Sequence, residues 1–210
     1  MQEQLLSIFV TYFVVIDPIG IAPLFASLTR GGAPAYRKRM AIKGVAIATG
    51  ILLFFSLTGD LLLRLLGISI PAFRIAGGAL LFILALDMVL ARPSGMRNAT
   101  VREQEEAHFK DDISVFPLAF PLLSGPGALT TVLLTTSRTQ ASPMLFYGAL
   151  GALLVVLGLT LLALLAAPRL LKLMGDTGAM VVDRLFGVIL AALAAQYVVD
   201  GVRASLLTAA

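Results

Sequence analysis

Two short stretches each carry two prolines five positions apart, next to glycine and a polar residue. The first is Asp17-Pro18-Ile-Gly20-Ile-Ala-Pro23, and the second is Pro121-Leu-Leu-Ser124-Gly125-Pro126-Gly127. A proline inside a helix removes a backbone hydrogen bond and clashes with the preceding turn, so both stretches predict an interrupted helix. A helix that restarts at proline exposes backbone N–H donors and the positive end of its dipole. Such donors suit a carboxylate or another small anion.

The two interruptions supply the candidate substrate-binding residues. These are Asp17, Pro18, Gly20, Pro23, Pro121, Ser124, Gly125, Pro126, Gly127 and Thr130. Asp17 could carry a coupling proton, orient a substrate ammonium, or serve only as the cap of a helix that begins at Pro18. The other interpretation of both stretches is a pair of structural kinks, because proline and glycine are common in membrane helices. Matching positions in two segments favour a binding site.

The composition places these stretches in a membrane. Apolar residues make up 59% of the 210 residues and charged residues only 13%, whereas a soluble domain carries roughly 25% charged residues. The mean hydropathy is +0.96. Six apolar segments are long enough to cross a bilayer. They run over Leu5–Leu28, Met40–Leu63, Phe73–Ala91, Ile113–Thr136, Met144–Ala167 and Ala179–Leu206.

The spans divide into two similar halves. A polar segment over residues 92–112 separates a first unit, residues 1–91, from a second, residues 113–210, and each has three spans. The third and sixth spans both begin with Arg-x-x-Gly, at Arg74 and Arg184. Because three is odd, the second unit must be inserted upside down relative to the first, as in many transporters. We therefore expect one all-α integral membrane domain, a 3+3 inverted repeat with broken or re-entrant helices in spans 1 and 4.

Basic residues indicate how the chain is oriented. Of the sixteen lysines and arginines, twelve lie in the first, third and fifth connections and four on the opposite side. Connections rich in lysine and arginine face the cytoplasm. We therefore predict a multi-pass protein of a bacterial inner membrane, with the lipid bilayer as a partner, residues 92–112 in the cytoplasm and both termini outside it.

Other residues of the spans predict packing rather than binding. Asp60 and Arg64 lie four residues apart on one helix, so a local ion pair or snorkelling explains them. Small residues allow membrane helices to approach closely. The glycines expected to do so are Gly77, Gly78, Gly148 and Gly151.

Several chemistries are excluded by what the sequence lacks. It has no cysteine, and its one histidine, His108, lies in the polar segment, so neither a His-based catalytic dyad in the membrane nor a metal site is expected. No Gly-rich phosphate loop is present. The pI of about 9.8 reflects basic residues in short connections and not a nucleic-acid-binding stripe. We predict no enzymatic activity, no cofactor and no nucleic-acid partner.

Three motifs occur together, spread over essentially the whole chain. They are Asp17-Pro18-x-Gly20-x-x-Pro23, Pro117-Leu-Ala-Phe-Pro121-Leu-Leu-Ser124-Gly125-Pro126-Gly127-Ala128, and Gln196-Tyr-Val-Val-Asp200-Gly201. In this combination the chain resembles the MarC family of bacterial membrane proteins. The resemblance implies a six-span inner-membrane protein of a group sometimes called neutral amino acid transporters. Many members have Asn at the position of Asp17, so proton coupling there is not a property that all of them must share.

The leading hypothesis is a secondary transporter of small solutes, with neutral amino acids such as glycine, alanine or serine as substrates. The substrate carboxylate would bind between the helix starts at Pro18 and Pro126, and a proton or a sodium ion would couple the movement. Two alternatives stay open: a passive channel or exporter for another small metabolite, and a non-transporting membrane scaffold. A homo-oligomer is compatible with each of them.

Overall fold

The computed structural model describes residues 1–90 and 112–208, and every regular element within them is helical. The elements are α1 (Gln2–Ile16), α2 (Pro18–Leu28), α3 (Pro34–Leu65), α4 (Ile70–Leu90), the irregular helical segment η1 (Ser114–Leu123), α6 (Pro126–Thr139) and α7 (Pro143–Thr208). Of the polar segment predicted over residues 92–112, only Asp112 falls within the described residues. The division into two three-span units therefore stays a prediction.

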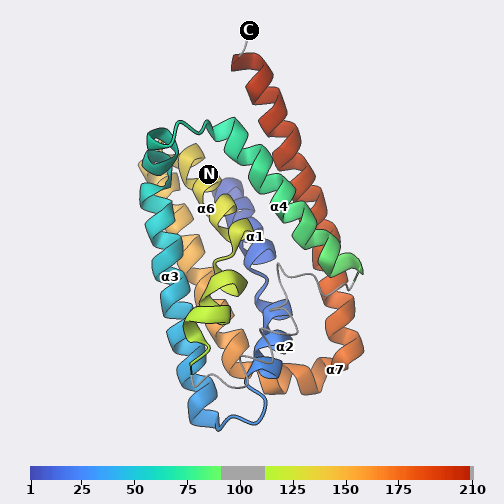
Figure 1. The fold of residues 1–210 in the computed structure, drawn as a ribbon. Helices are drawn as coiled ribbons and strands as arrows, with labels where there is room; N and C mark the ends of the chain where they lie inside the picture. The colour runs from blue at the N-terminus through green and yellow to red at the C-terminus, as the bar shows by residue number, and fades with distance from the viewer. Residues whose placement is uncertain (91–111, 209–210) are drawn as a thin grey trace.

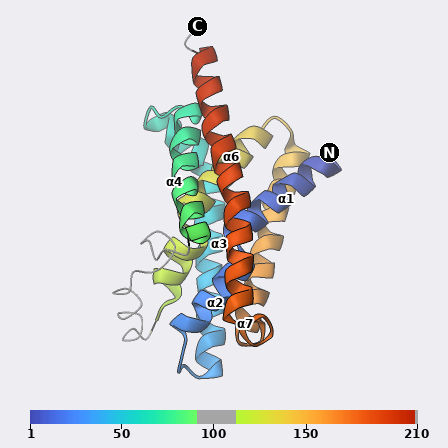
Figure 2. The same cartoon turned by 90° about the vertical axis from the view of Figure 1, so that its right-hand side faces the viewer.

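The elements form an elongated bundle with both chain termini at the same end (Figures 1 and 2). The connection from α2 to α3 and the turn within α7 lie at the opposite end. That turn falls at Gly175, whose φ of 63° belongs to the left-handed region. Glycine enters this region without steric cost, so it permits α7 to reverse its direction and run back along the bundle.

Most of these helices are long and apolar enough to cross a bilayer. Five segments meet both conditions, with mean hydropathies between 1.9 and 2.7, and η1 with α6 makes a sixth if this pair, bent by 57°, is counted as one span. The five are Gln2–Leu28, Pro34–Leu65, Ile70–Leu90, Pro143–Gly175 and Thr177–Leu207. The described part of the chain thus agrees with an all-helical membrane protein of five or six spans.

The bundle is apolar outside and holds polar side chains inside. Leu57, Leu61 and Leu185 are 63%, 59% and 62% exposed, and a soluble monomer rarely presents such large apolar side chains in contiguous patches. The buried polar residues of the described chain include Asp17, Thr29, Ser56, Ser114, Ser124, Thr130, Thr131, Thr136, Thr139 and Thr160. Several of their hydroxyls donate to a carbonyl one turn earlier, which satisfies them without water. This distribution suits a bundle surrounded by hydrocarbon.

Glycines bring α4 into close contact with α6 and with the last part of α7. A Cβ atom at Gly77 would lie 1.9 Å from the Thr130 Cγ2 atom, and one at Gly78 would lie 2.8 Å from the Ala194 carbonyl oxygen. Neither position has room for a side chain. The prediction that these two glycines allow close helix packing is confirmed.

The three other packing predictions had different outcomes. Asp60 and Arg64 form the expected ion pair, at 2.6 Å. A Cβ atom at Gly148 would lie 2.4 Å from Leu5, as expected of a close contact, but nothing lies within 4 Å of one at Gly151. The expectation for Gly151 is therefore wrong, because that face of α7 has no neighbouring helix in the described chain.

Replacing Gly77 with alanine is expected to lower the free energy of unfolding by about 1–3 kcal/mol, because the added methyl group overpacks the contact with Thr130. Unfolding of the purified protein in detergent measures this loss. The double variant Gly77→Ala/Thr130→Ala should recover part of it, since it removes the methyl and hydroxyl groups in the way. Gly50→Ala is the control, because a Cβ there meets nothing within 4 Å. Equal losses for Gly77→Ala and Gly50→Ala would contradict the packing argument.

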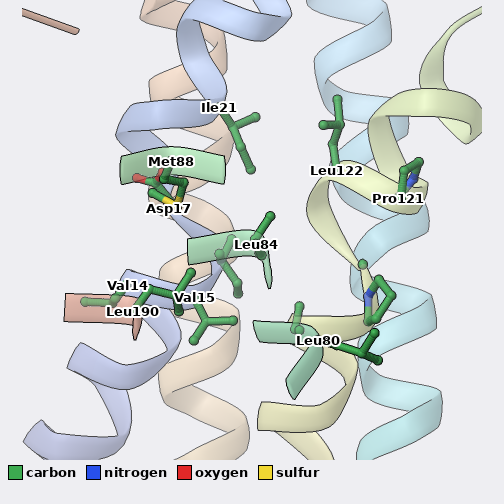
Figure 3. A pocket seen from close by; sticks show the side chains of 15 residues that line it. Val14, Val15, Asp17, Ile21, Leu80, Leu84, Met88, Pro121, Leu122 and Leu190 are labelled. Atoms are coloured by element: carbon green, nitrogen blue, oxygen red, sulfur yellow. The ribbon is translucent and has the colours of Figure 1, made fainter. Parts of the chain in front are cut away.

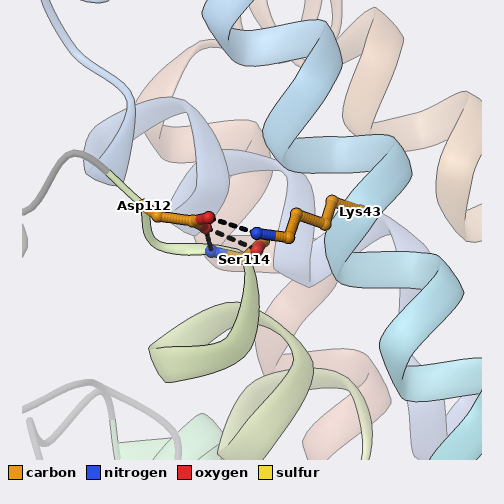
Figure 4. Close-up of polar contacts among 3 residues, drawn as sticks. All are labelled: Lys43, Asp112 and Ser114. Atoms are coloured by element: carbon orange, nitrogen blue, oxygen red, sulfur yellow. Dashed lines mark hydrogen bonds and ion pairs between the residues drawn. The ribbon is translucent and has the colours of Figure 1, made fainter.

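An ion pair ties the start of η1 to α3 (Figure 4). The Lys43 ammonium pairs with the Asp112 carboxylate, which also accepts a hydrogen bond from the Ser114 backbone N–H at 2.9 Å and another from the Ser114 hydroxyl. The Lys43 ammonium, followed by the two Ser114 donors, holds the pKa of Asp112 well below its usual range. This contact holds the start of η1 against α3.

The ion pair makes stability depend on pH. Because folding lowers the Asp112 pKa, the pair contributes stability above the ordinary carboxyl pKa of about 3.9 and loses it as the pH falls from there toward the folded-state pKa. Both side chains are more than a third exposed, so Asp112→Asn should cost less than about 1 kcal/mol at neutral pH. Unfolding measured across the acid range should show the two proteins converging. A difference that stays constant with pH would contradict this account.

Candidate functional site

A small cavity lies where the α1–α2 junction approaches the η1–α6 junction. Its volume is about 40 Å³, and a water molecule needs at least about 10–15 Å³ of such space. Residues of α4 and of the last part of α7 complete the lining. Figure 3 shows Asp17 on one side of the cavity and Pro121 and Leu122 on the other, with Leu84 of α4 between them.

Asp17 forms the junction between α1 and α2. Its φ of 50° and ψ of 67° place it in the left-handed region, which aspartate enters more readily than most residues. Its backbone N–H donates to the Phe13 carbonyl at 2.9 Å, and its carboxylate accepts from the Gly20 backbone N–H at 3.0 Å. The side chain is buried, at 2% exposure. Asp17 thus ends α1 and caps α2, as the Asp17-Pro18 pair predicted.

The start of α6 differs, because no side chain caps it. Gly125 is the N-cap residue, in extended backbone, and α6 has no side-chain cap hydrogen bond among the described residues. Pro126 has no N–H, so Gly127 and Ala128 carry the first amides of the helix. Both of these residues line the cavity. The positive end of α6 is therefore available to an anion there.

The irregular path of η1 brings Pro121 to the cavity wall. Phe120 has extended backbone, the conformation favoured before proline. The Ser124 backbone N–H and hydroxyl both donate to the Ala119 carbonyl, at 2.9 and 2.7 Å, and so close the segment before the break. A Cβ atom at Gly125 would lie 2.3 Å from the Pro121 carbonyl oxygen. Gly125 is thus required by space, whereas its φ of −66° is open to any residue.

The structure brings half of the predicted site residues together. The residues that line the cavity are Asp17, Pro121, Gly125, Pro126 and Gly127. The others, Pro18, Gly20, Pro23, Ser124 and Thr130, do not line it. Among these, the Gly20 amide serves the cap of α2, the Ser124 hydroxyl donates within η1, and Thr130 packs against α4. A role in substrate binding stays a prediction for all ten.

Sequence reasoning missed the apolar wall that α4 contributes. Leu80, Leu84 and Met88 line the cavity, together with Leu190 of α7. The three α4 residues lie four positions apart on one helix face. Nothing in their residue types distinguishes this face from the lipid-facing ones, so only the packing of α4 identifies it.

A second pocket, of about 480 Å³, lies at the end of the bundle that carries both termini. Within it, Arg138 Nη2 lies 3.2 Å from the Asp200 carboxylate, which also accepts a hydrogen bond from Gln196 at 2.7 Å. Helix α6 connects the two spaces, since its first turn lines the cavity and Thr135 lines this pocket. The sequence analysis did not predict this contact, although Arg138 and Asp200 carry opposite charges near the ends of the fourth and sixth spans.

Long apolar helices, an apolar outer surface and a small cavity in the interior define a multi-pass α-helical integral membrane protein. The family comparison narrows this class. A family model described as "MarC family integral membrane protein" matches residues 2–206. The chain belongs to the MarC family, which confirms the resemblance drawn from its three motifs.

Similar proteins occur in archaea and in bacteria. A UPF0056 membrane protein of Methanocaldococcus jannaschii is 39% identical over 201 residues, which cover 95% of this chain and 96% of the relative. The UPF0056 membrane protein YhcE of Escherichia coli is 33% identical, covering 93% and 90%. YvbG of Bacillus subtilis is 32% identical, covering 97% and 96%. No solved structure matches the chain.

Proposed function

We propose that this protein is a secondary transporter of small solutes, with neutral amino acids as the substrate class. The observation that carries the proposal is a cavity lined both by Asp17 and by the start of α6 at Pro126, which has no side-chain cap. Interrupted helices persist in a membrane only where protein buries them or where they line a cavity. In many transporters, interrupted helices of this kind hold the substrate.

The two sides of the cavity suit the two charges of an amino acid. The amides of Gly127 and Ala128 would bind the carboxylate, and the Asp17 carboxylate would orient the ammonium. The volume of about 40 Å³ equals roughly three water molecules, which restricts the ligand to glycine, alanine, serine or a solute of that size. The apolar wall of α4 leaves no partner for a charged substrate side chain.

Transport would proceed by rocking one three-span unit of the inverted repeat against the other. The pocket that contains Arg138 and Asp200 would be the entrance from the side of the two termini. The distribution of lysine and arginine supports a position of that side outside the cytoplasm, in a bacterial inner membrane. A proton or a sodium ion would drive the movement, since the described chain carries no ATP-binding module.

Counterflow in liposomes tests the proposal. Vesicles that contain the purified protein and are loaded with unlabelled alanine should take up labelled alanine faster than vesicles without internal alanine. The reason is that a carrier exchanges internal for external substrate. Glycine and serine should compete, and leucine should not. If no amino acid of this size moves under a proton or a sodium gradient, or by exchange, the proposal is wrong.

The two alternatives make different predictions in the same vesicles. A passive channel, or an exporter of another metabolite through the same cavity, gives no trans-stimulated exchange of alanine. A non-transporting scaffold would use residues 92–112 as its docking surface, so deleting that segment would remove its role. Retained alanine exchange after this deletion argues against the scaffold.

A further inference from the structure

A groove at the end opposite the termini combines an apolar floor with basic residues. Its volume is about 500 Å³, and it lies between the end of α2, the start of α3 and the part of α7 before the turn at Gly175. Phe25 and Leu164 form buried parts of the floor, at 2% and 1% exposure. The basic residues on its rim are Arg37 and Lys38 of α3 and Arg169 of α7.

The three basic side chains have no partner in the described part of the chain. Among the described residues, none forms an ion pair or a hydrogen bond with Arg37, Lys38 or Arg169. The Arg37 Nε atom is buried and still lacks an acceptor, which is an expensive state for a guanidinium N–H. No acidic residue is among the described residues that line the groove. The described residues of the groove therefore carry net positive charge.

We infer that this groove binds an anionic phospholipid of the surrounding leaflet. The phosphate lies between the guanidinium groups of Arg37 and Arg169, both of which line the groove. One acyl chain runs along the apolar floor toward Leu165, which is 41% exposed on the outer surface. Basic pockets between membrane helices on the cytoplasmic side bind anionic head groups in this way.

The other end of the bundle has a different charge balance. In the pocket beside the termini, Arg138 is paired with Asp200, and Glu3 lines the same space. A pocket with both charges offers an anionic head group no net attraction. The end with the unpaired arginines is also the one that the basic connections assign to the cytoplasm, where membranes carry their anionic lipids. This inference does not depend on transport activity.

Lipid titration of the full-length protein in a neutral detergent tests the inference. Native mass spectrometry counts bound lipid, and thermal unfolding reports its effect on the folded state. Phosphatidylglycerol should bind and raise the unfolding midpoint, and phosphatidylcholine with the same acyl chains should do neither. Arg37→Gln and Arg169→Gln should each weaken phosphatidylglycerol binding about fivefold, as expected for the loss of one basic residue near a lipid phosphate.

Matched controls decide between this groove and general surface charge. Arg39→Gln removes the same charge two residues from Arg37, at a position outside the groove, and should leave binding unchanged. Arg37→Lys keeps the positive charge and should retain most of the affinity for phosphatidylglycerol. It therefore distinguishes the loss of charge in Arg37→Gln from misfolding. Glycerol 3-phosphate, which has no acyl chain, should not bind. Equal binding of both lipids, equal binding of glycerol 3-phosphate, or an equal loss in Arg39→Gln would overturn the inference.

Discussion

Gly125→Ala should abolish amino acid binding and lower the free energy of unfolding by about 1–3 kcal/mol. The added Cβ would lie 2.3 Å from the Pro121 carbonyl oxygen. That oxygen belongs to the backbone, so no flexible side chain can turn away to make room. The chain must instead shift at the break, where η1 and α6 meet at 57°. Such a shift moves the first amides of α6, which we propose as the carboxylate site.

Two measurements separate the parts of this prediction. Unfolding in detergent gives the loss of stability, and the rise of the unfolding midpoint with added alanine gives ligand binding. Gly151→Ala is the matched control, since a Cβ there meets nothing within 4 Å. It should bind alanine normally and unfold with the same free energy, or one higher by about 0.5–1 kcal/mol. Normal alanine binding by Gly125→Ala would show that the break between η1 and α6 is not part of the binding site.

Asp17→Ala should lower the free energy of unfolding by about 2–3 kcal/mol. Part of the loss is the cap of α2, because the Gly20 amide loses its acceptor, at a cost of about 1 kcal/mol. The rest is the left-handed backbone at φ 50°, which costs a residue such as alanine about 1–2 kcal/mol. Unfolding in detergent measures the sum. Asp17→Gly should recover the second part and not the first.

Asp17→Asn separates the structural role of this residue from its charge. Asparagine caps helices and enters the left-handed region about as well as aspartate, so the variant should unfold like the natural protein. Loss of the negative charge should weaken alanine binding about tenfold or more, as for a hydrogen bond to a charged group. Unchanged alanine affinity in a stable Asp17→Asn protein would leave Asp17 as a helix cap only.

The helix starts at Pro18 and Pro126 could be predicted because proline acts on its own helical turn. The structure begins α2 and α6 at these residues, and local chemistry was sufficient to place both starts. The same local reasoning treated them as equivalent donors for a carboxylate. They differ, because the Asp17 side chain occupies the first turn of α2 whereas Gly125 has no side chain with which to cap α6.

Glycine positions predicted close helix packing less well, because packing depends on residues outside the local turn. Gly77 and Gly151 look alike in the sequence, yet Gly77 packs directly on Thr130 and Gly151 faces open space. A glycine permits a close approach, but the direction of its helix decides whether another helix is there. The same holds for the basic residues. Arg138 forms an ion pair with Asp200 across the bundle, whereas Arg37 has no partner in the described chain.

The sequence by itself determined the membrane class, the approximate limits of the spans and the two helix starts. Each depends on hydropathy or backbone chemistry within a few neighbouring residues. Tertiary structure alone decided three features: α4 walls the cavity, the start of α6 lacks the side-chain cap that α2 has, and three cations lie over an apolar groove with no partner among the described residues. These features join residues far apart in the chain, and side-chain packing, which no local pattern encodes, brings them together.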